Sequence, residues 1–420
     1  MKIWPTLPGM PKMNRRSIGD FFASKKEGVV TGAADNDPSG LVTYLQVGAI
    51  TGFSQLWLLV LSTPCLIVVE EMSSRVGAVL KKGLGRVLVD HYGMKIAFFF
   101  IALVALANIA TISADLAGMA SILAIIFNMQ SYHVLFVFLL GFITVLVLLR
   151  GNYQSISRYL FLLTPIFLAY VVSAFLAKPD WAVVLSDTVL PKIKFDLSYW
   201  SLAVAMLGTT ITPYVMFWET TEEVEEGRKV TEIETSKISI RTGMIFSNIM
   251  AAFMVILAAT VLFGRGGAIE DLHQAGEVLR PALGNASFGM FSLGILGAGL
   301  LAVPVLASTT AYMIADTFRF KAGLDNRQDR APAFYMVILL AILVAIGVSA
   351  VGINPIKMLI SSQILNGLVV PFLILGVYRI VNDRKLMGQY ISSWRSNFVA
   401  VLTVLVIAIA DFFMILGWFK

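Results

Sequence analysis

An acidic residue lies inside an apolar stretch near the start of the chain. The apolar residues of 29–51 are interrupted by the run Gly32-Ala33-Ala34-Asp35-Asn36-Asp37-Pro38-Ser39-Gly40. Pro38 lacks a backbone donor and Gly40 is a poor helix former, so a helix must break here. If the stretch crosses a membrane, such a break survives only where protein or a lined cavity supplies partners. An acidic side chain at that depth costs about 2.5–3.5 kcal/mol on insertion scales, so Asp37 is expected to bind a ligand.

A second break is predicted in another apolar stretch, at 199–227. This stretch is interrupted by Gly208-Thr209-Thr210-Ile211-Thr212-Pro213-Tyr214. Because Pro213 clashes with the preceding turn, the helix is expected to part just before it. Thr212 offers a hydroxyl at the break, and Tyr214 offers a phenol that donates or accepts a hydrogen bond. The two breaks together therefore predict a polar site inside an apolar molecule.

The ligand that these residues suit is a hard cation. Asp37 supplies an anionic oxygen, and unwound backbone exposes carbonyl oxygens beside it. In a later apolar stretch, Gln363 and Asn366 lie three residues apart on one helical face and add amide oxygens. Oxygen-only ligands favour Mg²⁺, Ca²⁺ or Mn²⁺ over softer transition ions. The three histidines fall in predicted loops or at the end of an apolar stretch, so imidazole ligation is not expected.

The composition places these residues in a membrane protein. Hydrophobic residues make up 58% of the chain and charged residues 14%, and the mean hydropathy is +0.82. Soluble domains have an apolar share of about 45–50%. The net charge of +6 does not indicate a nucleic-acid partner, because the basic residues fall in short loops beside apolar stretches. The partners expected are the lipid bilayer and a divalent metal ion. The lone cysteine excludes an intramolecular disulfide.

Windows of about 20 apolar residues predict an all-α protein with eleven transmembrane helices. The windows are bounded by charge, glycine or proline. They cover 29–51, 54–80, 96–127, 133–150, 153–177, 199–227, 236–264, 286–318, 332–352, 355–381 and 396–419.

The distribution of lysine and arginine predicts the orientation. With the N-terminus in the cytoplasm, cytoplasmic segments hold 25 basic residues and extracellular segments hold 7. This bias is the positive-inside pattern. Residues 1–28 lack the continuous apolar core and small-residue cleavage site of a signal peptide, so they are expected to form a cytoplasmic tail. We expect a multi-pass plasma-membrane protein, in a prokaryotic inner membrane, with its C-terminus extracellular and a monomeric state.

The spacing of the two breaks indicates an internal repeat. Pro38 and Pro213 hold corresponding places in two sets of five predicted helices, 29–177 and 199–381. An odd number of helices in each set makes the second set inverted relative to the first, as in LeuT-like transporters. Broken helices at matching positions of inverted repeats point to a transport site at the bilayer midplane. The remaining predicted segments are an extracellular loop at 178–198, with room for a short surface helix, a cytoplasmic loop at 382–395 and the eleventh helix within 396–420.

Several of these motifs resemble one family. Asp37-Pro38-Ser39-Gly40-Leu41-Val42-Thr43-Tyr44-Leu45-Gln46 resembles the D-P-G-N motif and the following T-D-L-Q of the natural resistance-associated macrophage protein (NRAMP) divalent-metal transporters. Further matches follow in the same order and spacing over about 350 residues of the sequence. They are Asp90-His91-Tyr92-Gly93, Asp115-Leu116-Ala117, Gly208 to Tyr214, Ala307-Ser308-Thr309-Thr310, Ser362-Gln363 and Pro371-Phe372.

The departures from the family motifs bear on selectivity. Gly40 stands where the family has the asparagine of D-P-G-N, Thr212 where it has the metal-selecting methionine of M-P-H, and Tyr214 where it has the histidine. Gly118 stands where the family has the glutamate that serves proton movement, and Glu219 aligns with a later histidine. These changes resemble the NRAMP-related magnesium transporters more than the proton-coupled manganese and iron importers.

The resemblance implies a transporter and not an enzyme. Small residues at the breaks, Ser39, Gly40 and Thr212, would leave room for a partly hydrated Mg²⁺, which keeps several waters. Loss of the thioether removes the soft ligand that favours Mn²⁺ or Cd²⁺. We therefore expect import of Mg²⁺, and also of Mn²⁺, by alternating access around Asp37, without obligatory proton coupling.

Other intramembrane acids are expected along the ion pathway. Glu219, Glu222 and Glu223 share one face of the cytoplasmic half of the sixth span, either lining an inner mouth or forming a solvated helix end. Glu70, Glu71 and Asp115 are expected to face a vestibule or to pair with Arg75.

Three other functions stay open from the sequence. A proton-coupled manganese or iron importer would use Asp37 and Asp115 as proton carriers. An amino-acid symporter of the same architecture is disfavoured, because Asp37 would repel a carboxylate. A membrane enzyme or receptor is disfavoured because the chain has no nucleophile-base constellation, no Walker-type loop and no predicted soluble domain.

Overall fold

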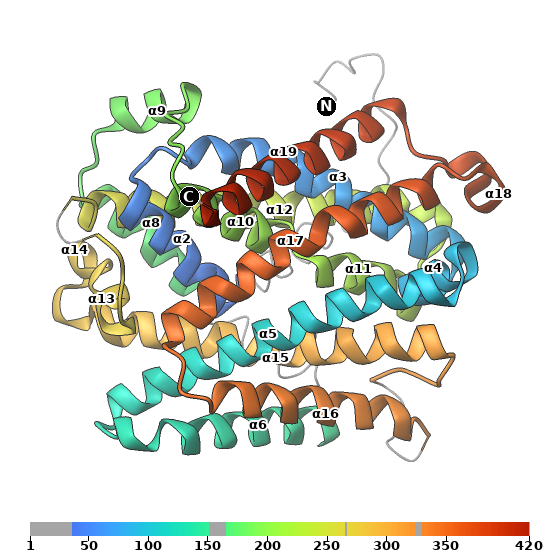
Figure 1. The fold of residues 1–420 in the computed structure, drawn as a ribbon, viewed down its shortest axis with the longest axis horizontal. Coiled ribbons are helices and arrows are strands. Elements are labelled where there is room, and N and C mark those ends of the chain that lie inside the picture. Colours follow the sequence, from blue (N-terminus) through green and yellow to red (C-terminus); the bar gives the residue numbers. More distant parts are fainter. Residues whose placement is uncertain (1–35, 151–164, 265–266, 325–329, 420) are drawn as a thin grey trace, which may run out of the picture.

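The computed structural model describes residues 36–150, 165–264, 267–324 and 330–419, and these are helical with short connections (Figure 1). The long helices are α3 (Leu56–Leu80), α5 (Met94–Ile126), α6 (His133–Arg150), α12 (Ile233–Val261), α15 (Ser287–Phe318), α16 (Pro332–Ser349), α17 (Pro355–Val381) and α19 (Trp394–Trp418). Medium helices are α2 (Pro38–Thr51), α8 (Pro165–Leu176), α10 (Leu197–Thr210) and α11 (Pro213–Glu225). Short helices are α4 (Leu84–Tyr92), α9 (Trp181–Val189), α13 (Leu272–Glu277), α14 (Arg280–Leu283) and α18 (Arg384–Met387).

Membrane-length helices account for most of the predicted spans. Among the described residues, nine helices are long and apolar enough to cross a membrane, counting α10 and α11 as one, or up to ten if the bent pair α8 and α9 is also one span. The predicted total of eleven transmembrane helices also requires the predicted helices at 29–51 and 153–177. Parts of both, and the predicted tail 1–28, lie outside the described residues, so eleven stays a prediction. The other predicted boundaries agree with the observed helix ends to within a few residues.

The predicted break before Pro213 is confirmed. Helix α10 ends at Thr210, and α11 begins at Pro213. The two residues between them, Ile211 and Thr212, have non-helical backbone angles. The break is local in origin, because proline disfavours a helical conformation in the residue before it. At the first break, α2 begins at Pro38 with Asp37 as its N-cap.

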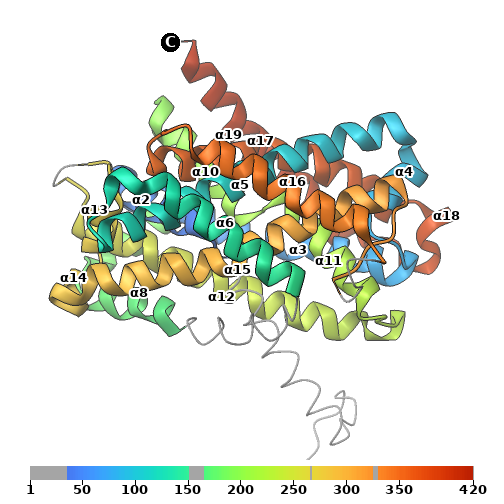
Figure 2. The same cartoon turned by 90° about the horizontal axis from the view of Figure 1, so that it is seen from below.

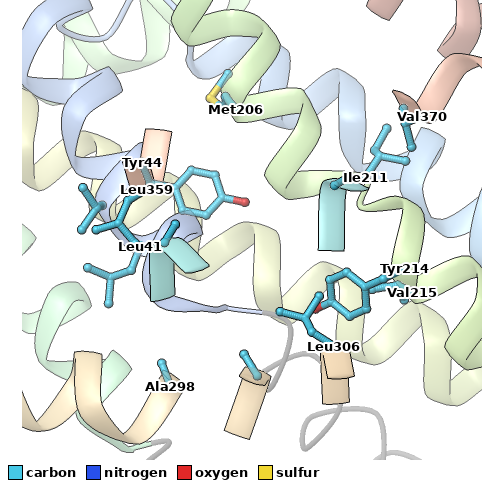
Figure 3. Packing of buried hydrophobic residues seen from close by; sticks show 14 of the residues in the cluster. Leu41, Tyr44, Met206, Ile211, Tyr214, Val215, Ala298, Leu306, Leu359 and Val370 are labelled. Atoms are coloured by element: carbon cyan, nitrogen blue, oxygen red, sulfur yellow. The ribbon is translucent and has the colours of Figure 1, made fainter. Parts of the chain in front are cut away.

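Helix α2 lies at the centre of the molecule. It contacts α10, α12, α17, α5 and α15, and its side chains are buried along almost its whole length. In Figure 2 the end of α19 projects from the bundle. Helices α6, α16 and α19 expose large apolar side chains, as expected of surfaces that face lipid. The broken helices are therefore enclosed by the others. Buried apolar side chains from α2, α10, α11, α15 and α17 fill the space around the breaks (Figure 3).

Two glycines let α10 and α17 cross closely. A Cβ atom at Gly208 would lie 2.1 Å from the backbone oxygen of Gln363, and one at Gly367 would lie 2.6 Å from that of Val204. No side chain fits at such distances, so glycine is required at both positions. Small residues serve this purpose at many membrane-helix contacts. The crossing fixes Gln363 next to the second break.

Short helices occupy the connections. Helix α9 lies in the loop at 178–198, where the sequence left room for a surface helix, and it is bent by 115° from α8. Helix α4, between α3 and α5, has no counterpart in the prediction. Its Asp90 accepts a hydrogen bond of 2.7 Å from Lys82, and lies 3.4 Å from Arg86 and 3.7 Å from Arg319 at the end of α15. The hydrogen bond from Lys82 holds the pKa of the Asp90 carboxyl below its ordinary value. These contacts hold α4 to the end of α15.

Candidate functional site

The Asp37 carboxylate caps the start of α2. The residue is extended, its side chain accepts a hydrogen bond from the Gly40 amide, and Pro38 follows as the first helical residue. An aspartate before a proline is a strong helix start, because it satisfies a free amide and the proline ring already has helical φ. Asp37 is 2% exposed. The sequence that breaks the helix therefore also places a buried carboxylate at its N-terminal end.

A second carboxylate meets the same helix start. Asp115, on α5, is fully buried. Its Oδ1 accepts hydrogen bonds from the Ser39 amide at 3.1 Å and the Ser39 hydroxyl at 2.6 Å. The sequence had left a vestibule position or a pair with Arg75 open for Asp115, and in the structure its hydrogen-bond partner is Ser39. The helix N-terminus stabilises both negative charges through its free amides and dipole.

The expectation that small residues leave space at the first break needs correction. A Cβ atom at Gly40 would lie 2.4 Å from the Thr209 hydroxyl oxygen, so α10 fills the space that the missing side chain leaves. The Ser39 hydroxyl is committed to Asp115. Gly40 thus permits close packing of α2 against α10. Thr209 was not singled out from the sequence, although it lies within the second interrupted run.

The amides of α17 reach the site as predicted, but they bond to each other. The Asn366 amide group donates to the Gln363 amide oxygen at 2.9 Å and to the Thr111 hydroxyl at 3.2 Å. Gln363 also lies next to Asp37. Both amide side chains are buried. They connect α17, α5 and the first break into one polar cluster.

Several buried side-chain atoms near the two breaks lack a hydrogen-bond partner among the described residues. In the polar cluster they are the oxygens Asn366 Oδ1 and Asp115 Oδ2 and the nitrogen Gln363 Nε2, and at the second break Thr212 Oγ1. Buried oxygens are nearly always paired, so a group of unpaired ones marks a place for a missing donor or cation. Within the described part of the chain, no three side chains from His, Cys, Asp and Glu come together as a metal cluster. The donor set consequently fits a hard cation that keeps some of its water.

Tyr214 lies just after the second break, on α11. It is the second residue of α11 and is 4% exposed. In Figure 3 it lies beside Leu306 of α15, and α11 contacts α15. Tyr44 instead lies 3.2 Å from the Thr210 hydroxyl, oxygen to oxygen. Tyr44, on α2, thus contacts the α10 side of the break. Tyr214 lies on the α11 side.

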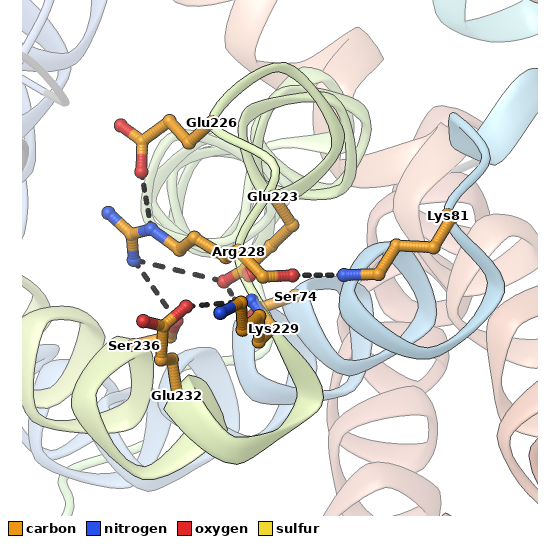
Figure 4. A network of polar contacts seen from close by, with 8 residues as sticks. All are labelled: Ser74, Lys81, Glu223, Glu226, Arg228, Lys229, Glu232 and Ser236. Carbon is orange, nitrogen blue, oxygen red and sulfur yellow. Dashed lines mark hydrogen bonds and ion pairs between the residues drawn. The ribbon is translucent and has the colours of Figure 1, made fainter.

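The acids of α11 divide into buried and exposed groups. Glu219 and Glu223 are buried, and Glu223 accepts a hydrogen bond of 2.7 Å from Ser74. Arg228 approaches Glu223 to 3.9 Å and also pairs with Glu226 (Figure 4). Glu219 and Glu222 line a cavity of about 20 Å³ beside this arginine. The buried members therefore form an acidic lining that one arginine partly neutralises.

The acids of α3 have different surroundings from those predicted. Glu70 is fully buried. Glu71 forms its ion pair with Arg241 of α12, at 2.6 Å, instead of with Arg75 alone. Because α3 packs against both α11 and α12, a residue distant in sequence provides this partner. Glu70 lies near Glu219, although it does not itself line the cavity beside Arg228.

The fold is that of a known class of membrane transporters. The chain matches a variant of the Eremococcus coleocola manganese transporter with a TM-score of 0.74 at 18% identity, covering 96% of this chain and 87% of that one. It matches Mhp1, a nucleobase-cation-symport-1 family transporter, with a TM-score of 0.63 at 14% identity, covering 94% and 91%. MhsT, in complex with L-phenylalanine, gives 0.58 at 13% identity, covering 92% and 98%. These structures share the LeuT-like fold that the sequence predicted.

Residues 28–417 match the model of the family described as natural resistance-associated macrophage protein-like, Nramp. The chain belongs to this family. It is also 25% identical over 390 residues to the divalent metal cation transporter MntH of Caldanaerobacter subterraneus subsp. tengcongensis, covering 91% of this chain and 88% of the relative. The family resemblance of the motifs is thereby confirmed.

Proposed function

We propose that this protein transports divalent metal ions, importing Mg²⁺ and also Mn²⁺ through a site around Asp37. The observation that carries the proposal is the presence of two unpaired buried oxygens, Asp115 Oδ2 and Asn366 Oδ1, in the polar cluster at the start of α2. Family membership supports a metal substrate, and relatives are named as divalent-metal or manganese transporters. Ser39 positions Asp115, and Gly40 brings α10 close.

The donor chemistry supports a hard ion. Thr212 presents a hydroxyl at the second break, and its oxygen is unpaired among the described residues. No thioether stands at that position, so the site lacks the soft ligand that favours Mn²⁺ or Cd²⁺ over abundant Mg²⁺. Mg²⁺ usually keeps several waters and needs few protein ligands. We infer that the oxygens of Thr212 and Asn366 bind the ion directly or through water.

The proposed energy source is the ion gradient and the membrane potential. Gly118 replaces the acid that the family resemblance associates with proton movement. A divalent ion gains about 2 × 2.3 kcal/mol per 100 mV of membrane potential. Uptake then needs no coupled proton. Glu219, Glu222, Glu223 and Glu70 would attract the ion on the cytoplasmic side, as an acidic lining does.

The proposed architecture follows the sequence prediction. Two inverted repeats, 29–177 and 199–381, would rock around the midplane site, with the helix within 396–420 outside them. The loops at 178–198 and 382–395 would lie outside and inside the cell. We infer a monomer in the plasma membrane of a prokaryote, with the N-terminus cytoplasmic and the C-terminus extracellular.

Uptake by proteoliposomes tests the proposal. Mg²⁺, Mn²⁺ and Ca²⁺ are supplied in turn, with and without a pH gradient, and an internal dye reports pH. The expected result is Mg²⁺ uptake that responds to membrane potential and does not acidify the lumen. Metal-dependent acidification would instead support a proton-coupled manganese importer, the second candidate. That candidate is favoured by the two buried carboxylates, Asp37 and Asp115, at one helix start.

Ion selectivity is expected to depend on residue 212. In the Thr212→Met variant, a thioether replaces the hydroxyl at the break, so preference should move toward Mn²⁺ and Cd²⁺ by roughly tenfold relative to Mg²⁺. Competition uptake with the three ions measures this ratio. Thr212→Val is the matched control, because it removes the hydroxyl without adding sulfur. An unchanged ratio in the methionine variant would mean that this position does not set selectivity. Gly40→Asn is unsuitable, because a side chain there collides with Thr209.

A further inference from the structure

Helices α5 and α17 pack side by side from the site to a cavity at one end of the molecule. The cavity has a volume of about 470 Å³, and by the predicted topology it is extracellular. Ser121 of α5 and Ile356 of α17 both line it. Its described lining residues include two acids, Glu270 and Asp271, and no lysine or arginine. The cavity therefore suits a positively charged solute.

The site lies six residues deeper along the same two helices. Asp115 bonds to Ser39, and the Ser362 hydroxyl of α17 lies 3.4 Å from the Ser39 hydroxyl. Asp115 precedes Ser121 by six residues on α5, and Ser362 follows Ile356 by six on α17. Six residues of helix span about 9 Å. The cavity and the site are thus close, on matching levels of two antiparallel helices.

Gly118 and Leu359 meet between the two levels. Gly118 and Leu359 lie halfway along, three residues from each end of the interval on their helices. A Cβ atom at Gly118 would lie 3.3 Å from Leu359 Cδ1 and 3.4 Å from Cδ2, so the leucine side chain lies directly on the glycine. Leu359 is fully buried, and Figure 3 shows it grouped with Leu41 and Tyr44 of α2.

The floor of the cavity is fixed next to this contact. His133, at the start of α6, lines the cavity, and its Nε2 lies 3.1 Å from the Ala117 backbone oxygen. Ala117 immediately precedes Gly118. The α5 backbone at this level is therefore held by α6.

We propose that Leu359, lying on Gly118, is the gate between an external cation vestibule and the metal site. The proposal deepens the proposed function and rests on it. The vestibule holds a hydrated divalent cation, which its acidic rim attracts. An apolar side chain blocks a hydrated ion without binding it, and a rotamer change of one leucine opens the path. Gly118 then matters in two ways. It replaces the acid of the family, and it provides the surface that the Leu359 side chain contacts when the gate is closed.

This role has a consequence for engineering the chain. A glutamate at residue 118 would meet Leu359 already at its Cβ atom. Restoring the family acid alone would therefore require the end of the Leu359 side chain to shift by a few tenths of an ångström. The glycine and the leucine act as a pair.

Thiol accessibility tests the gate without measuring transport. In a Cys65→Ala background, which removes the single cysteine of the chain, Ser362→Cys reports access to the site and Ser121→Cys reports access to the vestibule. A membrane-impermeant, positively charged methanethiosulfonate reagent is added outside proteoliposomes, and labelling rates are measured by mass spectrometry. Adding Leu359→Ala is expected to raise the Ser362→Cys rate by at least about tenfold, since the open fraction increases. The Ser121→Cys rate should stay unchanged.

The controls separate gating from general loosening. Leu375→Ala makes the same truncation on α17 at a position that is 47% exposed, and it should change neither rate. A Ser121→Cys rate unaltered by Leu359→Ala shows that the vestibule is intact. Equal Ser362→Cys labelling with leucine and with alanine at residue 359 would overturn the proposal, as would a Ser121→Cys thiol that the reagent does not reach. Because this experiment measures labelling and not ion uptake, the gate proposal can fail while the transport proposal holds. The transport proposal can likewise fail while the gate proposal holds.

Discussion

The Asp37→Asn variant is expected to lose divalent-metal uptake by at least about 100-fold, since even residues behind a metal ligand change affinity by about 10- to 100-fold. Asparagine has nearly the same shape as aspartate and can still accept the hydrogen bond from the Gly40 amide that caps α2. The variant should therefore keep the helix start and lose only the charge. Uptake of Mg²⁺ and Mn²⁺ into proteoliposomes, at matched protein density, measures the effect.

Asp411→Asn is the matched control for this charge removal. Asp411 is also an intramembrane acid, on α19, and it has a buried oxygen without a partner among the described residues. It is not part of the polar cluster around α2, so its replacement should leave uptake close to the original. If Asp37→Asn transports Mg²⁺ as well as the control does, the site has been placed wrongly.

Asp115→Asn is expected to weaken the apparent affinity for the transported ion by about 10- to 100-fold. The asparagine oxygen can still accept both hydrogen bonds from Ser39, so the connection between α2 and α5 remains. What is lost is the negative charge beside Asp37 and the unpaired Oδ2. Concentration dependence of uptake gives the apparent affinity, and size-exclusion chromatography checks the fold.

Ser39→Ala separates the two roles of Asp115. It removes one hydrogen bond to the carboxylate, worth about 1.5–3 kcal/mol for a charged acceptor, and leaves the charge in place. We expect a smaller loss of ion affinity than in Asp115→Asn, accompanied by a lower melting temperature. A larger loss of affinity in Ser39→Ala than in Asp115→Asn would mean that Asp115 acts as a structural tether and not through its charge.

The local features of this fold were predictable. The apolar windows located the helices, because about 20 apolar residues are needed to cross the hydrocarbon and charges mark the ends. Pro213 located the end of α10, since the effect of proline reaches only its neighbours. Helix α4 was missed because it is short and only partly apolar, and a hydropathy window does not register such a segment.

Contacts between distant residues were not predictable from one sequence. Ser39 and Asp115 are separated by 76 positions, and Glu71 and Arg241 by 170. A hydropathy pattern predicts that an acid lies in a membrane helix. It does not predict which residue the acid contacts, because the contact depends on how the helices rotate and pack. Arg75 is the nearest basic residue to Glu71 along α3, but helix packing brings Arg241 closer to the Glu71 carboxylate.

The sequence by itself determined that this is a membrane protein with a helix start at Pro38 and a helix break at Thr212, because hydropathy and proline act over short stretches of chain. Only the tertiary structure decided what the small residues do. Read along the chain, the position of Gly40 suggested empty space and that of Gly118 a missing acid. Packing fills the first with Thr209 and the second with Leu359. A glycine leaves a gap on its own helix, and the neighbouring helix decides whether that gap becomes a cavity or a contact.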